Sequence, residues 1–272
     1  MQRRKYFIIL VILMELLIMG CQLVSLPSLV RARNTVDGSG NVVEERRAVS
    51  GFSGVELATF GDVIIDFGDE ESLIIEAEDN LIEYFETDVH AGMLVISTQP
   101  FTNLRNTEPV RFYVTMKELY SLHISGSGEI QVPDFETDRF SIDISGSGDI
   151  TIGRLDTDIF EMDINGSGDV DIEELNAENF DVTINGSGDI SIGTGLVEEQ
   201  NIRINGSGKY RAQDLESPVV DVRIGGSGDV TIWATDSLDV SIYGSGDVYY
   251  YGKPQVTSSG TGSGDIISQG DK

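Results

Sequence analysis

The stretch Asn165-Gly-Ser-Gly-Asp-Val-Asp-Ile172 decides the fold, because edited copies of it recur along the chain. Each copy holds a Gly-Ser-Gly turn, and in most copies an aspartate follows it. The first glycines of successive copies are 20 residues apart five times and then 18 residues apart twice. Self-similarity at a fixed period of this length is typical of repeat architectures, in which each repeat is one supersecondary unit.

The residues that flank each turn alternate between apolar and polar. Isoleucine stands two positions before the first glycine in most copies, as at Ile144, Ile164 and Ile184. A period of two with β-branched residues on one side predicts strands with one buried face. Each unit is therefore strand, turn, strand and a second turn near a Leu or Phe. Stacked units predict a parallel β-helix; a meander of antiparallel hairpins is the alternative. In a β-helix, Phe140, Phe160 and Phe180 would form a stack.

Each Gly-Ser-Gly is interpreted as a structural turn. Glycine reaches positive φ without a Cβ clash, so two glycines let the chain reverse within three residues. Asp and Asn side chains hydrogen-bond nearby backbone N–H groups, so the polar residues around the turn are interpreted as local turn chemistry too. The turn glycines are Gly126, Gly128, Gly146, Gly148, Gly166, Gly168, Gly186, Gly188, Gly206, Gly208, Gly226, Gly228, Gly244, Gly246, Gly262 and Gly264.

The acidic residues after the turns allow a second interpretation, a column of carboxylates that binds calcium. Oxygen ligands in repeated loops bind calcium in β-rolls. Here the period is 20 residues and not that of a nonapeptide repeat, and Lys209 interrupts the column. Turn geometry is the preferred hypothesis, calcium is the alternative, and no other cofactor is indicated. The candidate calcium ligands are Asp149, Asp169, Asp189, Asp229, Asp247 and Asp265.

Short strands are also predicted upstream of the repeats. Residues 46–118 hold apolar–polar alternations separated by Gly, Asp and Asn, which is the pattern of half-buried strands. One helical turn is expected within residues 80–86 and a loop at 102–108. The predicted domain spans residues 46–270, with irregular strands at 46–118 and tandem repeats at 119–270.

The N-terminus carries the features of an export signal. Residues 1–20 combine a basic start, an apolar run and a glycine before Cys21, which resembles a bacterial lipoprotein signal with Cys21 as the lipidated residue. An uncleaved membrane anchor is the alternative, and Glu15 counts against both because a carboxylate is costly in a bilayer. Residues 21–45 are predicted to be a tether. Either interpretation gives an exported protein anchored to the cell envelope.

The net charge and the reactive residue types in the sequence limit the classes of function that fit. The formal net charge of −28 excludes nucleic acid as a partner and favours cations or basic partners. The single cysteine excludes an intrachain disulfide. His90 and His123 are the only histidines, and no catalytic motif is present, so the chain is predicted not to be an enzyme. The C-terminal aromatic residues Trp233, Tyr243 and Tyr249 to Tyr251 are expected to cap the stack or to form a binding patch.

Three features together resemble a known family. They are "VSGFSGVEL" from Val49, "IIEAEDNLIEYFETDVHAGMLVI" from Ile74, and the tandem "GSGD" units. The chain resembles, over residues 46–269, the family DUF2807, labelled an auto-transporter adhesin head or GIN domain. The resemblance implies a right-handed β-helix of pectin-lyase-like shape without recognised catalytic residues. Lys209 and the shortened last repeats depart from the family pattern, so irregular stacking is expected there.

These features favour a non-enzymatic surface module, anchored to the envelope, that binds or adheres to a protein or glycan ligand. A structural or sensory envelope scaffold is the alternative. A polysaccharide-processing enzyme is the third hypothesis, because β-helices host such enzymes, but the acidic charge opposes acidic glycans as substrates.

Overall fold

The computed structural model describes residues 34–272, and Thr35–Lys272 forms one compact unit. The predicted signal segment and Cys21 lie outside the described residues. Within residues 34–272 no helix is long and apolar enough to cross a membrane. The elements in chain order are β1 (Asn34–Asp37), β2 (Val42–Arg47), β3 (Gly54–Leu57), β4 (Asp62–Phe67), β5 (Ser72–Glu78), η1 (Ile82–Tyr84), β6 (Phe85–His90), β7 (Met93–Thr98), β8 (Thr102–Arg105), β9 (Arg111–Met116), β10 (Ser121–Ile124), β11 (Ile130–Val132), β12 (Phe135–Ile144), β13 (Ile150–Ile164), β14 (Val170–Ile184), β15 (Ile190–Ile204), β16 (Tyr210–Ile224), β17 (Val230–Ile242), β18 (Val248–Tyr251), β19 (Gln255–Ser259) and β20 (Ile266–Gly270).

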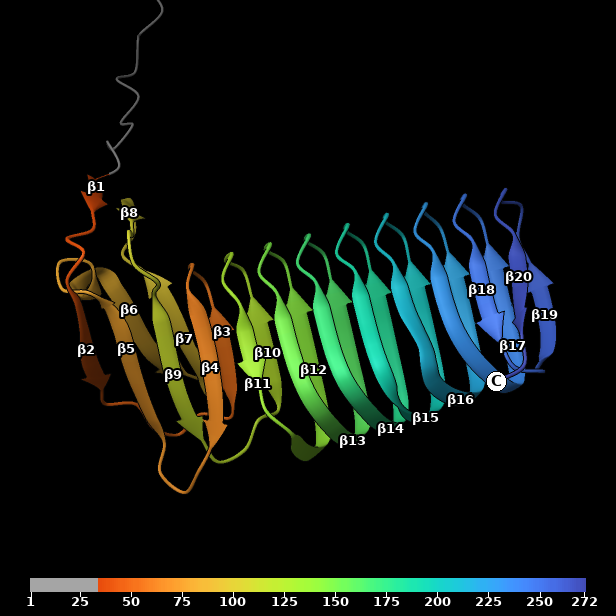
Figure 1. The fold of residues 1–272 in the computed structure, drawn as a ribbon, viewed down its shortest axis with the longest axis horizontal. Helices are drawn as coiled ribbons and strands as arrows, with labels where there is room; N and C mark the ends of the chain where they lie inside the picture. Colours follow the sequence, from red (N-terminus) through yellow and green to blue (C-terminus); the bar gives the residue numbers. More distant parts are fainter. Residues whose placement is uncertain (1–33) are drawn as a thin grey trace, which may run out of the picture. The chain divides into compact units, whose positions relative to one another are not determined.

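The repeats form a parallel β-helix whose coils follow one another in chain order (Figure 1). Strand β13 pairs in parallel with β14 at an offset of 20 residues, so that Ile150 lies opposite Val170. This pairing omits Gly153 and Asp158, and two consecutive residues point outward at the same places. In β13 the second turn predicted for the unit is thus a pair of bends within one continuous strand, and β14 to β17 also run through it without a break. The parallel pairing confirms the β-helix and makes the hairpin meander wrong for the repeats.

Identical side chains stack inside the coils, as predicted. The isoleucines before the turns are buried from Ile124 to Ile242. The ring centroids of Phe140 and Phe160 are 5.4 Å apart, and those of Phe160 and Phe180 are 4.6 Å apart. These distances match the spacing of adjacent strands, about 4.8 Å, because each ring comes from one coil. The stack therefore gives each coil a matched apolar contact with the next.

A buried polar network follows the phenylalanine stack. Gln200 occupies the register position after Phe180 and is fully buried. The Tyr210 hydroxyl donates to Gln200 Oε1 at 2.7 Å, and Gln200 Nε2 donates to the Ser217 hydroxyl. The Ser217 hydroxyl donates in turn to the carbonyl of Val197 at 2.6 Å. Burial raises the pKa of Tyr210. The side-chain groups of Tyr210, Gln200 and Ser217 are thus all hydrogen-bonded, which removes the usual cost of burying an amide.

The N-terminal part starts two rows of paired strands, both within the 18-stranded sheet, that the coils extend. In one, β2 pairs antiparallel with β5 and β5 with β9, which continues in parallel to β4 and β11. In the other, β6 pairs antiparallel with β7, which continues in parallel to β3 and β10. The helical turn predicted within residues 80–86 is confirmed as η1.

Two predictions for this part are wrong. The tether predicted at 21–45 contains strand β1 and most of strand β2 within the described residues. The loop predicted at 102–108 contains strand β8, which pairs with β1. Strands β1 and β8 have four residues each and no buried residue, so their sequences lack the alternation that marks a half-buried strand.

The reason given for the turn glycines is also wrong. None of the glycines in the Gly-Ser-Gly turns has positive φ. A Cβ on Gly166 would instead lie 1.8 Å from the carbonyl oxygen of Gly146 in the preceding coil, and one on Gly168 would lie 1.9 Å from the carbonyl oxygen of Gly148. The turns stack so closely that only hydrogen fits between successive backbones. Glycine is therefore required by contact between coils rather than by backbone conformation.

The buried carboxylate of Glu78 ties the N-terminal segment to the sheet. Glu78 Oε1 accepts from the N–H of Gly40 at 2.7 Å and from the hydroxyl of Thr107 at 2.7 Å, and Oε2 accepts from the N–H of Thr107 at 2.9 Å. Burial raises the pKa of Glu78, but these hydrogen bonds outweigh it and leave the pKa below its ordinary value. The charged form is thus the one that the fold stabilises.

We expect Glu78→Gln to lower the free energy of unfolding by about 2–3 kcal/mol at neutral pH, because an amide donor would face a backbone N–H. A carboxylate with a lowered pKa contributes stability above its unfolded pKa and loses it as pH falls through the folded value. The difference between the two proteins should therefore shrink below about pH 4.5 in urea unfolding series. A difference independent of pH would contradict this role for the charge. Exposed Glu86→Gln is the control, since it should change stability little at any pH.

Candidate functional site

The column of acidic residues after the turns is a hydrogen-bonded ladder. Asp169 donates its backbone N–H to Asp149 Oδ1 at 2.8 Å, and Asp189 donates its N–H to Asp169 Oδ1 at 2.7 Å. The same bond joins Asp265 to Asp247 at 2.8 Å. The same kind of bond recurs along the column, where each acceptor carboxylate takes a backbone N–H of the next coil rather than of its own turn. The acceptors are Asp149, Asp169, Asp189, Asp229 and Asp247. This corrects the prediction of local turn chemistry.

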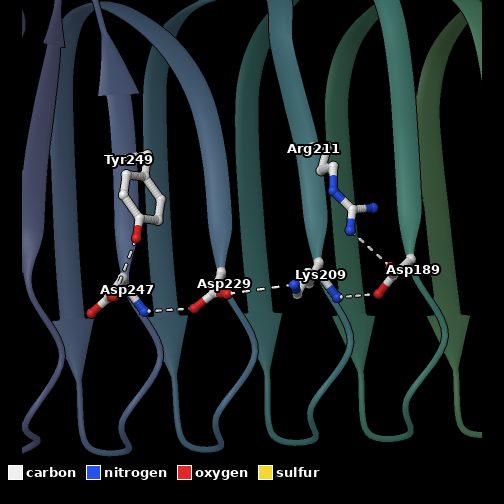
Figure 2. Close-up of polar contacts among 6 residues, drawn as sticks. All are labelled: Asp189, Lys209, Arg211, Asp229, Asp247 and Tyr249. Atoms are coloured by element: carbon white, nitrogen blue, oxygen red, sulfur yellow. Dashed lines mark hydrogen bonds and ion pairs between the residues drawn. The ribbon is translucent and has the colours of Figure 1, made fainter.

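Positive and phenolic groups lie along this ladder (Figure 2). Lys209 donates its backbone N–H to Asp189 Oδ1 at 2.8 Å, and its ammonium lies 4.0 Å from the carboxylate of Asp229. Arg211 donates to Asp189 Oδ2 at 3.0 Å. The Tyr249 hydroxyl donates to Asp247 Oδ2 at 3.3 Å, and the negative charge of Asp247 together with burial raises the pKa of Tyr249. These groups offset the repulsion between stacked carboxylates.

A parallel ladder of amides runs before the turns. Asn185 Nδ2 donates to Asn165 Oδ1 at 2.8 Å, and Asn205 Nδ2 donates to Asn185 Oδ1 at 2.8 Å. Among the residues that the structure describes, no three carboxylate, imidazole or thiolate groups are placed to hold a metal ion together. The hydrogen bonds of both ladders join neighbouring coils.

We expect Asp169→Asn with Asp189→Asn to change the melting temperature equally in calcium and in chelator. Asparagine keeps the Oδ1 acceptor for the next N–H, so the cost should stay below about 1 kcal/mol per site, mainly from the lost pairing of Asp189 with Arg211. Thermal unfolding by circular dichroism measures both conditions. A wild-type melting temperature that rises in calcium, with a smaller rise in the double variant, would establish the calcium column instead.

An acidic groove runs across successive coils on the described surface. It has a volume of about 970 Å³. Its walls come from β12, β13, β14 and β15 and from the segment before β10, and their side chains include eight carboxylates and one lysine, Lys117. The carboxylates are Glu118, Asp134, Glu136, Asp138, Asp156, Asp158, Glu178 and Glu198.

Hydrogen bonds order part of this groove. Asn176 Nδ2 donates to Asp156 Oδ1 at 2.8 Å, and Leu196 N–H donates to Asn176 Oδ1 at 3.2 Å. The Tyr120 hydroxyl donates to Glu118 at 2.6 Å, and this bond raises the pKa of Tyr120. Asp134 Oδ1 accepts the N–H of Arg154 at 2.9 Å, and the Arg154 guanidinium lies 3.3 Å from Asp156 Oδ2. The groove still has many more carboxylates than cations, which favours a ligand that carries several amines or guanidinium groups.

Sequence reasoning missed the groove, although a signal was present. Asp138, Asp158, Glu178 and Glu198 follow one another at the repeat period, and each lies in the groove. Alignment of the repeats by their outward-facing columns would have found this acidic line. The predictions used mainly the inward columns and the turns.

The predicted histidine and aromatic candidates are separated. His123 lies in strand β10, and its Nδ1 is 3.0 Å from Asp143 Oδ1 on the next coil. This agrees with a cross-strand pair. Trp233 and Tyr251 are register partners on adjacent strands, whereas Tyr250 packs against the core and Tyr243 is 63% exposed. The aromatic residues are therefore not one cluster.

The family model described as "Putative auto-transporter adhesin, head GIN domain", DUF2807, matches residues 51–158 and 151–254. The chain belongs to this family. The two matches together cover most of the described chain, so the resemblance seen in the tandem turns is confirmed. A search of curated proteins finds no match.

Solved structures share the fold. A protein of Parabacteroides distasonis titled "Putative lipid binding protein" is 26% identical, with a TM-score of 0.73 over 86% of this chain and 99% of that one. A "putative adhesin" of Parabacteroides merdae is 22% identical, with a TM-score of 0.76 over 86% and 99%. A second "putative adhesin" from P. distasonis is 22% identical, with a TM-score of 0.75 over 86% and 100%. These neighbours show the fold, and the family description supports an adhesin-type module at the cell surface or envelope.

Proposed function

We propose that this chain is a non-enzymatic adhesion module of the cell envelope that binds a basic protein surface through its acidic groove. The observation that carries the proposal is the groove itself, in which carboxylates from at least four successive strands line one hollow. Stacked coils hold these charges at fixed spacing without a flexible loop. Such an array favours a partner with several lysines or arginines and steers it into contact.

The negative charge of the groove favours a basic protein partner over a lipid. One similar structure is titled a lipid binding protein, but the groove carboxylates would repel anionic head groups. The proposal likewise differs from a passive scaffold, which would need no charged hollow.

Binding of fluorescent poly-lysine to the immobilised protein tests the groove. We expect the triple variant Asp158→Asn, Glu178→Gln and Glu198→Gln to weaken binding at least about tenfold and to lower its salt dependence. The matched control is Asp163→Asn, Asp171→Asn and Glu173→Gln, which removes three exposed charges outside the groove. Equal loss in both variants would mean that net charge alone attracts the probe and would overturn the groove.

Anchoring at the envelope is the second part of the proposal. We propose that Cys21 is lipidated after removal of residues 1–20. Cys21→Ser should then move the protein from the membrane fraction to the soluble fraction after mild alkaline wash, and should abolish labelling by a fatty-acid probe. Retention of Cys21→Ser in the membrane without labelling of either protein would favour an uncleaved anchor.

A further inference from the structure

Two aromatic rings lie next to each other on the outer face of the last coils. Trp233 in β17 and Tyr251 in β18 are direct register partners, and both side chains are partly buried. Ring faces attract cations through their negative quadrupole, and Trp attracts them most strongly. Two rings from adjacent strands therefore offer a preformed surface for a positive group.

A cation already occupies this surface. The ammonium of Lys272 lies 5.4 Å from the centroid of the Trp233 ring and 5.0 Å from that of Tyr251. The same ammonium pairs with the carboxylate of Asp214 in β16. The Lys272 side chain is only 24% exposed, so it lies in the site and does not extend into solvent. Three successive strands thus supply two rings and one carboxylate to a single ammonium group.

We propose that Trp233, Tyr251 and Asp214 form a binding site for a lysine side chain of a partner protein, with Lys272 as an internal occupant that competes for it. The carboxylate accepts N–H groups, so it favours a primary ammonium over a quaternary one. None of these residues lines the acidic groove. The site therefore stands independently of the proposed function.

Lys272 competes with a partner lysine because it belongs to the same chain as the site. A group held on the same chain has an effective concentration on the order of millimolar. A partner lysine must displace it, so the site binds isolated amines weakly and a partner that presents lysine next to other contacts more strongly. Removal of the Lys272 ammonium should open the site to free ligands.

Fluorescence provides a direct test, because Trp233 is the only tryptophan of the chain. The probe is the capped tripeptide Gly-Lys-Gly, with the Nε-acetylated lysine peptide as its matched control. We expect Lys272→Ala to give a saturable change in Trp233 emission with half-saturation at least about fivefold below that of the wild type. The acetylated peptide should give no saturable change with either protein.

Further variants distinguish binding at this site from binding in the acidic groove. Adding Asp214→Asn to Lys272→Ala should raise the half-saturation several-fold, while the groove triple variant should bind the tripeptide like the wild type. The site is overturned if Lys272→Ala shows no saturable response, or responds equally to the acetylated peptide. Tighter binding of choline than of the lysine peptide would overturn the choice of ligand. Lys272→Gln repeats the measurement with a longer polar side chain, and circular dichroism verifies that each variant is folded.

Discussion

Gly186→Ala is expected to lower the free energy of unfolding by more than about 4 kcal/mol, within the range of the largest single-residue effects. The added Cβ would lie 1.8 Å from the carbonyl oxygen of Gly166 and 2.8 Å from its carbonyl carbon. Neither neighbour is free to move, because the carbonyl of Gly166 accepts the N–H of Ser187 at 3.0 Å. The two coils would have to separate at this turn. Urea unfolding followed by circular dichroism measures the loss.

The matched control for this variant lies in a later turn of the same kind. A Cβ on Gly225 would meet the side-chain oxygen of Asn205 at 3.2 Å and no backbone atom closer than 3.8 Å. Gly225→Ala should therefore cost no more than about 1 kcal/mol, because a side chain can adjust. Similar losses in Gly186→Ala and Gly225→Ala would show that the turn glycines serve chain flexibility and not contact between coils.

This pair of variants also shows where sequence reasoning succeeds and where it stops. The positions of the turns and the alternation around Ile164 and Ile184 predict the strands and their parallel stacking, because the sequence shows both the repeat period and the buried positions. The sequence does not show why glycine is needed in the turns, since positive φ and close contact between backbones each select glycine. Only the position of Gly146 beside Gly166 separates the two explanations.

The sites were harder to predict than the fold because their contacts depend on which side chains of different coils meet. The column that holds Asp149 and Asp169 was predicted, but the hydrogen bond from one coil to the next was not, because it depends on the rotamer and spacing of stacked residues. The contact of Lys272 with Trp233 joins residues of different coils that no repeat pattern aligns. Strands β1 and β8 pair only with each other and have no buried residue, so their sequences need not alternate.

Phe160→Ala is expected to lower the free energy of unfolding by about 3–5 kcal/mol. Phe160 is fully buried, and its ring lies between those of Phe140 and Phe180, with an interplanar angle of 7° to the latter. Removal leaves a cavity that the rigid coils on either side cannot fill. Tyr243→Ala is the control, because Tyr243 is 63% exposed and its loss should change stability by less than about 0.5 kcal/mol.

A double-mutant cycle decides whether the stack itself contributes beyond the volume of each ring. Phe140→Ala with Phe160→Ala should cost less than the sum of the single variants by about 0.5–1.5 kcal/mol, the usual coupling of an aromatic pair. Phe140 and Phe180 are both neighbours of Phe160 but not of each other, so Phe140→Ala with Phe180→Ala should be nearly additive. In a repeat stack the stability is a sum of coil and interface terms. Coupling as strong between Phe140 and Phe180 as between neighbours would contradict this nearest-neighbour account and would mean that the coils unfold as one block.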